Sequence, residues 1–263
     1  MTATAGVAGV RPKFGKTWGI SAGWFDYNND GLLDLIVINY VNWSLETEPP
    51  CRVGEIRAYC SPNSYTGQPN ILYHNNGDGT FTDVSMKSGI DKLVGKGMGV
   101  AFADYDNDGY TDLFISNDTF RNFLLHNNHD GTLSEMAILS GVAYNENGKS
   151  IAGMGTDFRD VDNDGRPDIF VVAMQGDTFL LFRNRGRDFA DITSSSGVAR
   201  ATSGLTAWGS GIFDFDDDGN KDLFATCASI LDNSGEIDHM RPNCTTFFCG
   251  ILAAAAGRCV LRM

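Results

Sequence analysis

The sequence predicts an all-β fold, a β-propeller of four-stranded antiparallel blades. Three observations lead to this fold class. One hairpin sequence recurs four times in register, a second hairpin sequence follows it three times, and the two together occupy about 55 residues, the length of one blade. The 31 glycines against 7 prolines fit many tight turns rather than a linker or a collagen-like repeat.

The first repeated hairpin places two strands around a nine-residue, aspartate-rich loop. Its four copies start at Ile20, Met98, Met154 and Trp208, and their loops open at Asp26, Asp104, Asp160 and Asp214. Mostly small residues precede the loop, which suits an inner strand whose backbone lies close to its neighbours. The positions after the loop are rich in β-branched and aromatic residues, as expected of a second strand.

The second repeated hairpin has a Gly/Asn/Asp turn between two further strands. Its three copies are 21 residues long and start at Asn70, Asn122 and Thr178. The predicted blades therefore span 18–90, with an insertion at 40–69, then 98–142 and 153–198, followed by an incomplete blade at 208–243. Residues 1–10 match the outer-strand part of a preceding blade. The repeat is lost after Asn243, so that 244–263 fit no strand of the repeat.

The number of repeats is low for a closed ring. A propeller closes with roughly four to eight blades, and the sequence holds three full units and one partial unit. We therefore interpret the chain as a truncated or frame-shifted piece of a larger propeller.

The formal charge of −13 is concentrated in the loops. About half of the 33 acidic residues lie in the four loops, and the rest of the chain is nearly balanced by the 20 basic residues. This distribution indicates that the loops bind a divalent cation. No basic stripe is present to neutralise phosphates, so nucleic acid is not expected as a partner. No apolar run reaches membrane-spanning length, and no export signal opens the chain.

Each loop has the oxygen pattern of a calcium site. Side-chain oxygens at positions 1, 3 and 5 can surround one ion, glycine at position 6 permits the sharp turn, the carbonyl of position 7 points inward, and aspartate at position 9 closes the shell. Hard oxygen ligands in a flexible loop favour Ca²⁺ over Mg²⁺. The predicted ligands of about four Ca²⁺ ions are Asp26, Asn28, Asp30, Leu32 and Asp34; Asp104, Asp106, Asp108, Tyr110 and Asp112; Asp160, Asp162, Asp164, Arg166 and Asp168; and Asp214, Asp216, Asp218, Asn220 and Asp222.

Two other calcium motifs share the start of this pattern and do not fit. An EF-hand requires glutamate at position 12, where the four loops have Val37, Ile115, Val171 and Ala225. A dockerin-like loop fails for the same reason. A set of solvated turns is the remaining alternative, and four copies sharing all nine positions make it improbable. Without an ion, the crowded carboxylates are expected to raise one another's pKa.

The four loops resemble the D-x-D-x-D-G-x-x-D loop that the FG-GAP/VCBS repeat family carries between the first two strands of each blade. The segments NILYHNNGDGTFTDVS and GMGVAFADYDNDGYTDLFISND are more narrowly similar to the cartilage-acidic-protein-like, ASPIC/UnbV-associated proteins. The resemblance covers 20–227 and implies a seven-bladed propeller, calcium binding, secretion or surface display, and no established catalytic activity. Asn28 replaces an aspartate of the family pattern, so the first site is expected to be weaker, and the family's usual C-terminal extension is missing.

Several residues outside the loops invite interpretation. Cys51 and Cys60 form a candidate disulfide that would staple the insertion, and two independent thiols are the alternative. One repeat column holds His74, His126 and Arg183, and this exchange of histidine for arginine favours a structural or surface role over metal ligation. Trp18, Trp24 and Trp208 are expected to fill blade cores.

The function predicted from the sequence is that of a calcium-binding extracellular propeller acting as a binding, adhesion or scaffold module. The expected partner is a protein or a glycan, and the expected location is extracellular, cell-surface or periplasmic. The insertion, with Trp43, Tyr59, Tyr65, Arg52 and Arg57, is the candidate partner surface, unless it is an ordinary decorated loop. The alternative is a carbohydrate-binding or polysaccharide-degrading propeller. No nucleophile elbow, zinc-protease motif or nucleotide-binding fingerprint is present, so an enzyme is not expected.

Overall fold

A computed structural model of the chain describes residues 17–46, 48–228 and 230, and the backbone of 247–253. The chain is all-β, with 7% helix and 42% strand. The predicted remnant at 1–10 and the connection after the fourth hairpin, 231–246, lie outside the described residues. So does the end of the predicted tail, 254–263.

Three sheets have four antiparallel strands each, joined in chain order. Sheet 1 contains β1 (Gly19–Phe25), β2 (Asp34–Asn39), β6 (Ile71–Asn75) and β7 (Phe81–Asp83). Sheet 2 contains β9 (Gly97–Ala103), β10 (Asp112–Asn117), β11 (Phe123–Asn127) and β12 (Leu133–Glu135). Sheet 3 contains β13 (Gly153–Arg159), β14 (Asp168–Ala173), β15 (Leu180–Asn184) and β16 (Phe189–Asp191). Both hairpins expected in each unit are therefore present.

Sheet 4 has three described strands, β17 (Ala207–Phe213), β18 (Asp222–Cys227) and β19 (Phe247–Ala253). The expectation that the segment after Asn243 fits no strand is wrong for β19, which pairs antiparallel with β18 from Cys227 opposite Phe247 to Asp222 opposite Ala253. Strand pairing uses backbone groups, so an extended segment can complete the open edge of β18 without the repeat's side-chain pattern.

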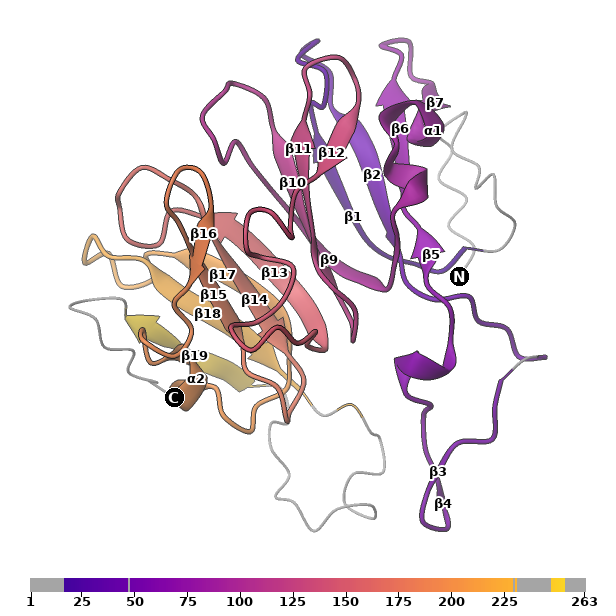
Figure 1. Cartoon of the computed structure of the whole chain (residues 1–263), viewed down its shortest axis with the longest axis vertical. Coiled ribbons are helices and arrows are strands. Elements are labelled where there is room, and N and C mark those ends of the chain that lie inside the picture. Colours follow the sequence, from indigo (N-terminus) through magenta and orange to yellow (C-terminus); the bar gives the residue numbers. More distant parts are fainter. Residues whose placement is uncertain (1–16, 47, 229, 231–246, 254–263) are drawn as a thin grey trace.

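The remaining elements are short and lie between the strands. They are β3 (Arg52–Val53), β4 (Ile56–Arg57), β5 (Gln68–Pro69), β8 (Val94–Gly95), the helical turns α1 (Ser85–Ser88) and α2 (Val198–Ala201), and the 3₁₀ turns η1 (Pro62–Ser64) and η2 (Ile90–Lys92). The insertion contributes β3, β4, η1 and β5, and β5 pairs with β8 ahead of sheet 2. It leaves sheet 1 at the end opposite the β1–β2 loop (Figure 1).

The sheets stand side by side, with the first strands β1, β9, β13 and β17 next to one another (Figure 1). At several positions the inner strands lie too close together for any side chain larger than a hydrogen atom. A Cβ atom added to Gly99 would lie 2.7 Å from the Met154 carbonyl oxygen, and one added to Gly155 would lie 2.6 Å from the Trp208 carbonyl oxygen. The prediction of crowded inner strands is therefore confirmed, and backbone approach is its cause.

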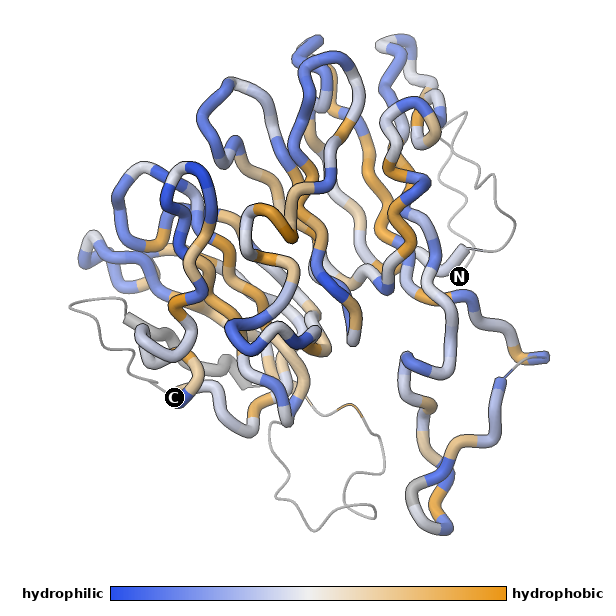
Figure 2. The backbone as a smooth tube through the Cα atoms, in the orientation of Figure 1, coloured by the Kyte–Doolittle hydropathy of each residue, from blue (hydrophilic) through white to orange (hydrophobic). Residues whose placement is uncertain are grey.

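Two apolar clusters fill the spaces between the sheets. Phe25 of sheet 1 stacks on Phe102 of sheet 2 with ring centroids 5.0 Å apart, in the first cluster. Phe114 of sheet 2 meets Phe158 of sheet 3 in the second. The hydropathy of the chain follows this division, with apolar strands inside and polar loops at the sheet ends (Figure 2). No helix among the described residues is long and apolar enough to cross a bilayer.

The tryptophans are not core residues, contrary to expectation. Trp18, Trp24 and Trp208 are 43%, 53% and 41% exposed. Because Gly23 and Phe25 face sheet 2, strand alternation turns Trp24 to the other face of sheet 1. There it packs on Phe81, with ring centroids 5.8 Å apart.

Candidate metal centre

The four aspartate loops occupy equivalent places, each joining the first two strands of its sheet. All four therefore lie at one end of the sheets, and the turns between the third and fourth strands of sheets 1 to 3 lie at the same end (Figure 1). The loop of sheet 2 illustrates the arrangement. Asp104 Oδ1 accepts a hydrogen bond from the Asp108 backbone at 3.0 Å, and its Oδ2 accepts one from Gly109 at 2.8 Å. This pair of bonds recurs at Asp26, Asp160 and Asp214.

The fifth position is fixed in the same way in all four loops. Asp108 Oδ1 accepts from the Tyr110 backbone at 2.9 Å. The equivalent acceptors are Asp30, Asp164 and Asp218. One oxygen of each position-5 carboxylate is therefore held by its own loop. Glycine at position 6 has φ of 84° to 89°, the left-handed conformation that its predicted role requires.

The ninth position supplies a deeply buried carboxylate. Asp112 is fully buried, its Oδ2 accepts from the Tyr105 backbone at 3.1 Å, and its Oδ1 accepts from the Asn127 backbone at 2.8 Å. Burial, with a smaller contribution from the nearby carboxylates of Asp106 and Asp108, raises the pKa of Asp112 to about 7. The expected mutual rise holds only in part, because burial is the main cause at Asp112 and the pKa values of Asp30 and Asp108 are lowered.

The same burial acts on the other ninth-position aspartates. It raises the pKa of Asp168 to about 6 and raises the pKa values of Asp34 and Asp222. Asp34 and Asp168 accept the same two backbone hydrogen bonds as Asp112. Each loop therefore presents a carboxylate that is costly to leave charged and uncompensated in the folded state.

Three of the loops bring carboxylate oxygens together. The oxygens within each group lie within 4.8 Å of one another, and the groups are Asp104, Asp106 and Asp108; Asp160, Asp162 and Asp168; and Asp214, Asp216 and Asp218. Within the described part of the chain, the first loop forms no such group of three acids. Asn28 stands there and its amide donates to Asp30 Oδ2 at 2.9 Å. These oxygens fit a hard divalent cation. In the third loop, the guanidinium groups of Arg166 and Arg183 already pair with Asp164 and Asp162.

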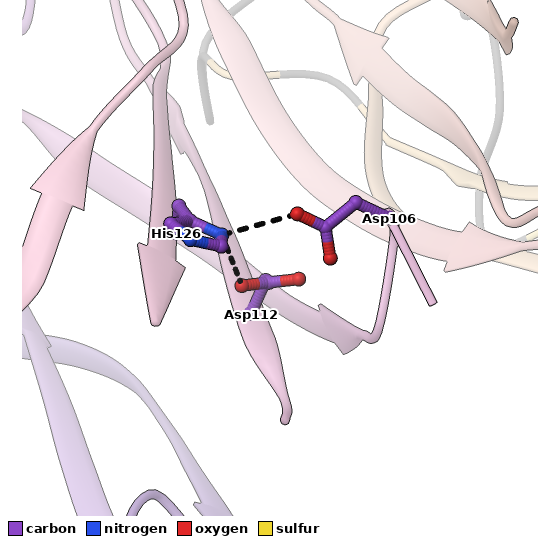
Figure 3. Close-up of side chains that lie close together, drawn as sticks. All are labelled: Asp106, Asp112 and His126. Carbon is purple, nitrogen blue, oxygen red and sulfur yellow. Dashed lines mark ion pairs between the residues drawn. The ribbon is translucent and has the colours of Figure 1, made fainter. Parts of the chain in front are cut away.

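The third-strand column of histidine and arginine points into these loops. His74 Nδ1 lies 3.0 Å from Asp34 Oδ1, and Arg183 lies 2.5 Å from Asp162 Oδ2. His126 Nδ1 lies 3.3 Å from Asp106 Oδ2 and 3.4 Å from Asp112 Oδ1 (Figure 3). From the sequence, these three residues were expected to have a structural or surface role. In the structure they lie against the predicted metal ligands. The exchange of histidine for arginine did not predict this position.

Sequence reasoning also missed His129. It replaces a turn glycine of sheets 1 and 3, adopts φ of 65°, stacks on Tyr110 and reaches Asp108 Oδ2 with Nε2 at 2.6 Å. The signal was present in the sequence, where His129 stands two residues after Asn127, as Gly77 does after Asn75 and Gly186 after Asn184.

A column of asparagines connects the loops of neighbouring sheets. Asn127 Nδ2 donates to the Tyr27 carbonyl at 2.7 Å, and Asn184 Nδ2 donates to the Tyr105 carbonyl at 2.8 Å. Each asparagine thus crosses from its own sheet to the loop of the preceding sheet. A further cross-loop bond runs from Asn29 Nδ2 to the Gly109 carbonyl at 2.9 Å. The loops are consequently part of the interface between sheets.

The insertion is stapled and tied to sheet 2. Cys51 and Cys60 form a disulfide with Cα atoms 5.2 Å apart, so this predicted pairing is confirmed. Tyr40 Oη donates to Asp118 Oδ2 at 2.5 Å. Of the candidate partner residues, Trp43 and Tyr65 both donate to Glu48, and Arg52 donates to the Glu55 carbonyl at 2.8 Å. Trp43 and Tyr59 remain 38% and 65% exposed.

Comparison with curated proteins identifies relatives over part of the chain. Cartilage acidic protein 1 of Xenopus tropicalis is 31% identical over 166 residues, which is 59% of this chain and 24% of that protein. The human protein of the same name is 47% identical over 49 residues, 19% of this chain and 7% of that protein. The chain therefore spans about a quarter, or less, of the length of these relatives.

Solved structures with a similar chain path are distant in sequence. The Vibrio cholerae biofilm matrix protein Bap1 is 15% identical with a TM-score of 0.44, over 81% of this chain and 30% of that chain. The Bacillus licheniformis rhamnogalacturonan lyase PL11 is 14% identical with a TM-score of 0.43, over 91% and 38%.

The repeat itself is matched directly. Residues 59–115, 109–171 and 160–225 each match the FG-GAP-like repeat, and together they cover more than half of the chain. With its recurring loops and four-stranded sheets, the chain belongs to the FG-GAP-like repeat family.

Proposed function

We propose that this chain is a calcium-binding part of an extracellular β-propeller that acts as a binding, adhesion or scaffold module. The observation that carries the proposal is the shared geometry of the loops. In three of them, carboxylate oxygens from three aspartates lie within 4.8 Å of one another, fixed by the same backbone hydrogen bonds. Family membership supports the propeller, in which each sheet is one blade.

Calcium would have a structural role in this proposal. Each ion supplies two positive charges to buried carboxylates such as Asp112 and Asp168, while the loop supplies hard oxygen ligands in a turn formed by glycine. Because cross-sheet hydrogen bonds end on the same loops, an ion that orders a loop would also fasten neighbouring blades. The site of Asn28 is proposed as the weakest, since an amide oxygen carries no full charge.

The test is the melting temperature of the full chain, dialysed free of metal, measured with added calcium and with chelator. An ion that binds only the folded state raises the melting temperature in proportion to its occupancy. Asp112→Asn and Asp168→Asn should each reduce the calcium-induced rise. Asp130→Asn, which removes an equal charge from the exposed β11–β12 turn, should not. Identical melting curves with and without calcium would overturn the proposal.

The module is proposed to bind rather than to catalyse. The acid groups brought together in the described residues belong to the ion loops, where backbone donors hold their oxygens. The partner, a protein or a glycan, is proposed to meet the insertion, which presents Trp43 and Tyr59 at the end opposite the loops. A glycan array and a polysaccharide hydrolysis screen on the full-length protein test this point. Turnover lost on substitution of residues outside the loops would favour the enzyme alternative.

A further inference from the structure

In the second loop, an imidazole nitrogen and two carboxylates come close enough together to share one ion. His126 Nδ1, Asp106 and Asp112 offer three ligand atoms that all lie within 4.8 Å of one another. Figure 3 shows the ring of His126, from β11, facing both aspartates, with its nitrogen 3.3 Å from Asp106 Oδ2 and 3.4 Å from Asp112 Oδ1. The cluster is thus a mixed nitrogen and oxygen donor set.

His126 Nδ1 is a buried atom that has no hydrogen-bond partner. Its contacts with Asp106 and Asp112 are longer than ordinary hydrogen bonds. The ring is held in place by Tyr105, whose edge-on ring lies 6.1 Å away between centroids. A cation bound between the two carboxylates would bring the nitrogen and the oxygens into one coordination shell.

The separations match the coordination shell of a small transition-metal ion. Zinc binds imidazole nitrogen and carboxylate oxygen at about 2.0–2.2 Å in a tetrahedron, which separates neighbouring ligand atoms by roughly 3.3–3.5 Å. The two distances from His126 Nδ1 fall in this range. Calcium takes oxygen ligands almost exclusively, whereas imidazole suits zinc. The nitrogen ligand therefore favours zinc over calcium, a choice that the distances alone would not decide.

We propose that His126, Asp106 and Asp112 form a zinc site in the second blade, where Zn²⁺ competes with Ca²⁺ for the two carboxylates. The inference deepens the proposed function and rests on it, because both aspartates belong to the second calcium loop. Three protein ligands leave a fourth position open. His129, which reaches Asp108 Oδ2 at 2.6 Å, is a positioning residue that holds this neighbouring carboxylate of the same loop.

The other blades supply internal controls. In the first blade, His74 Nδ1 already has a partner in Asp34 Oδ1 at 3.0 Å, and Asn28 stands where the second blade has Asp106. In the third blade, Arg183 occupies the same column and places its own cation against Asp162. His74 also lies 4.0 Å from Asp30 Oδ2, but within the described residues only the second loop brings an imidazole and two carboxylates all within 4.8 Å of one another.

The experiment uses the full chain with its thiols alkylated, so that no cysteine binds zinc. Calcium is titrated first, and zinc is then titrated by calorimetry into the calcium-loaded chain. Cobalt is used in a parallel titration, in which strong visible absorption reports tetrahedral coordination. We expect one zinc per chain. His126→Gln should weaken zinc binding by more than about 100-fold, because losing even an outer-shell partner costs about 10–100-fold. His74→Gln is the matched control and should leave zinc binding unchanged.

The outcomes separate this inference from the proposed function. Zinc binding by the wild type that is lost in His126→Gln supports the zinc site. If the first titration finds no calcium binding, the calcium proposal fails, but this loss of zinc binding still supports the zinc site. Zinc bound equally by His126→Gln and the wild type overturns the site. A chain that binds calcium but no zinc would also overturn the site. The same holds if His126→Gln and His74→Gln weaken zinc binding equally.

Discussion

Asn127 and Tyr27 are 100 residues apart in sequence and joined by a 2.7 Å hydrogen bond from Nδ2 to the backbone carbonyl. The same amide group also donates to the Thr111 carbonyl at 3.3 Å, and its oxygen accepts from the His129 backbone at 3.1 Å. One fully buried side chain thus connects the first loop, the second loop and the turn beside them.

Asn127→Ala should destabilise the chain by about 1–3 kcal/mol, because it leaves buried backbone groups without partners. Chemical denaturation of the calcium-loaded chain measures the loss. Asn75→Ala is the matched control, since the Asn75 amide donates to Leu33 of its own sheet and is half-buried. Equal losses in the two variants would mean that the cross-sheet bond adds nothing.

The metal-free chain should lose stability as pH rises from about 4 to about 7. The pKa of Asp112 is raised to about 7 and that of Asp168 to about 6, so the folded state binds more protons than the unfolded state in this window. The stabilising contribution is complete below the unfolded pKa of about 4 and is lost as pH passes the folded value.

The calcium-loaded chain should show the opposite trend, because the ion needs deprotonated carboxylates. Its calcium-induced rise in melting temperature should therefore grow across the same pH window. Melting curves at several pH values, with and without calcium, measure both slopes, and Asp112→Asn should flatten each. A metal-free slope that is the same in the variant and the wild type would show that Asp112 does not titrate as described.

Tyr40→Phe should loosen the insertion from sheet 2. Asp118 is 5% exposed, burial raises its pKa, and the Tyr40 hydroxyl donates to its Oδ2 at 2.5 Å. Removing this donor is expected to cost about 1–3 kcal/mol. Denaturation at neutral pH measures the loss, with Tyr65→Phe as the control because its hydroxyl contacts Glu48 within the insertion. A greater loss for Tyr65→Phe would reverse the interpretation.

The double substitution Cys51→Ser and Cys60→Ser should open the insertion without affecting the loops. Closing so short a loop stabilises it by about 2–3 kcal/mol, and the insertion lies at the other end of the sheets (Figure 1). Limited proteolysis followed by mass spectrometry should find faster cleavage within 40–69. The calcium-induced change in melting temperature should be the same as in the wild type. A reduced calcium effect would imply coupling between the two ends.

Much of the fold and the site follows from local pattern. The loop positions were predictable because the turn, the glycine and the aspartates are determined within nine residues, and Asp112 lies where its position 9 required. The disulfide was predictable for the same reason, since Cys51 and Cys60 share one short loop. In each case the interacting groups are close in sequence.

The features that the sequence did not predict depend on contacts with a neighbouring sheet or strand. The reach of Asn127 to Tyr27 requires two sheets to be placed side by side, which no local pattern specifies. Trp24 resembles a core residue by type, yet strand alternation turns it away from sheet 2. β19 pairs through its backbone, so the absence of the repeat's side chains did not prevent a strand.

Each of these asparagines donates to a loop that comes earlier in the chain, so the contacts between sheets depend on the order in which the chain is made. The first and second loops are each fastened by a side chain that is synthesised later, Asn127 for one and Asn184 for the other. On a ribosome, the hydrogen bond that ties an aspartate loop to the next blade would therefore form only after the third strand of that blade has emerged. A chain released early would lack this bond at its last loop.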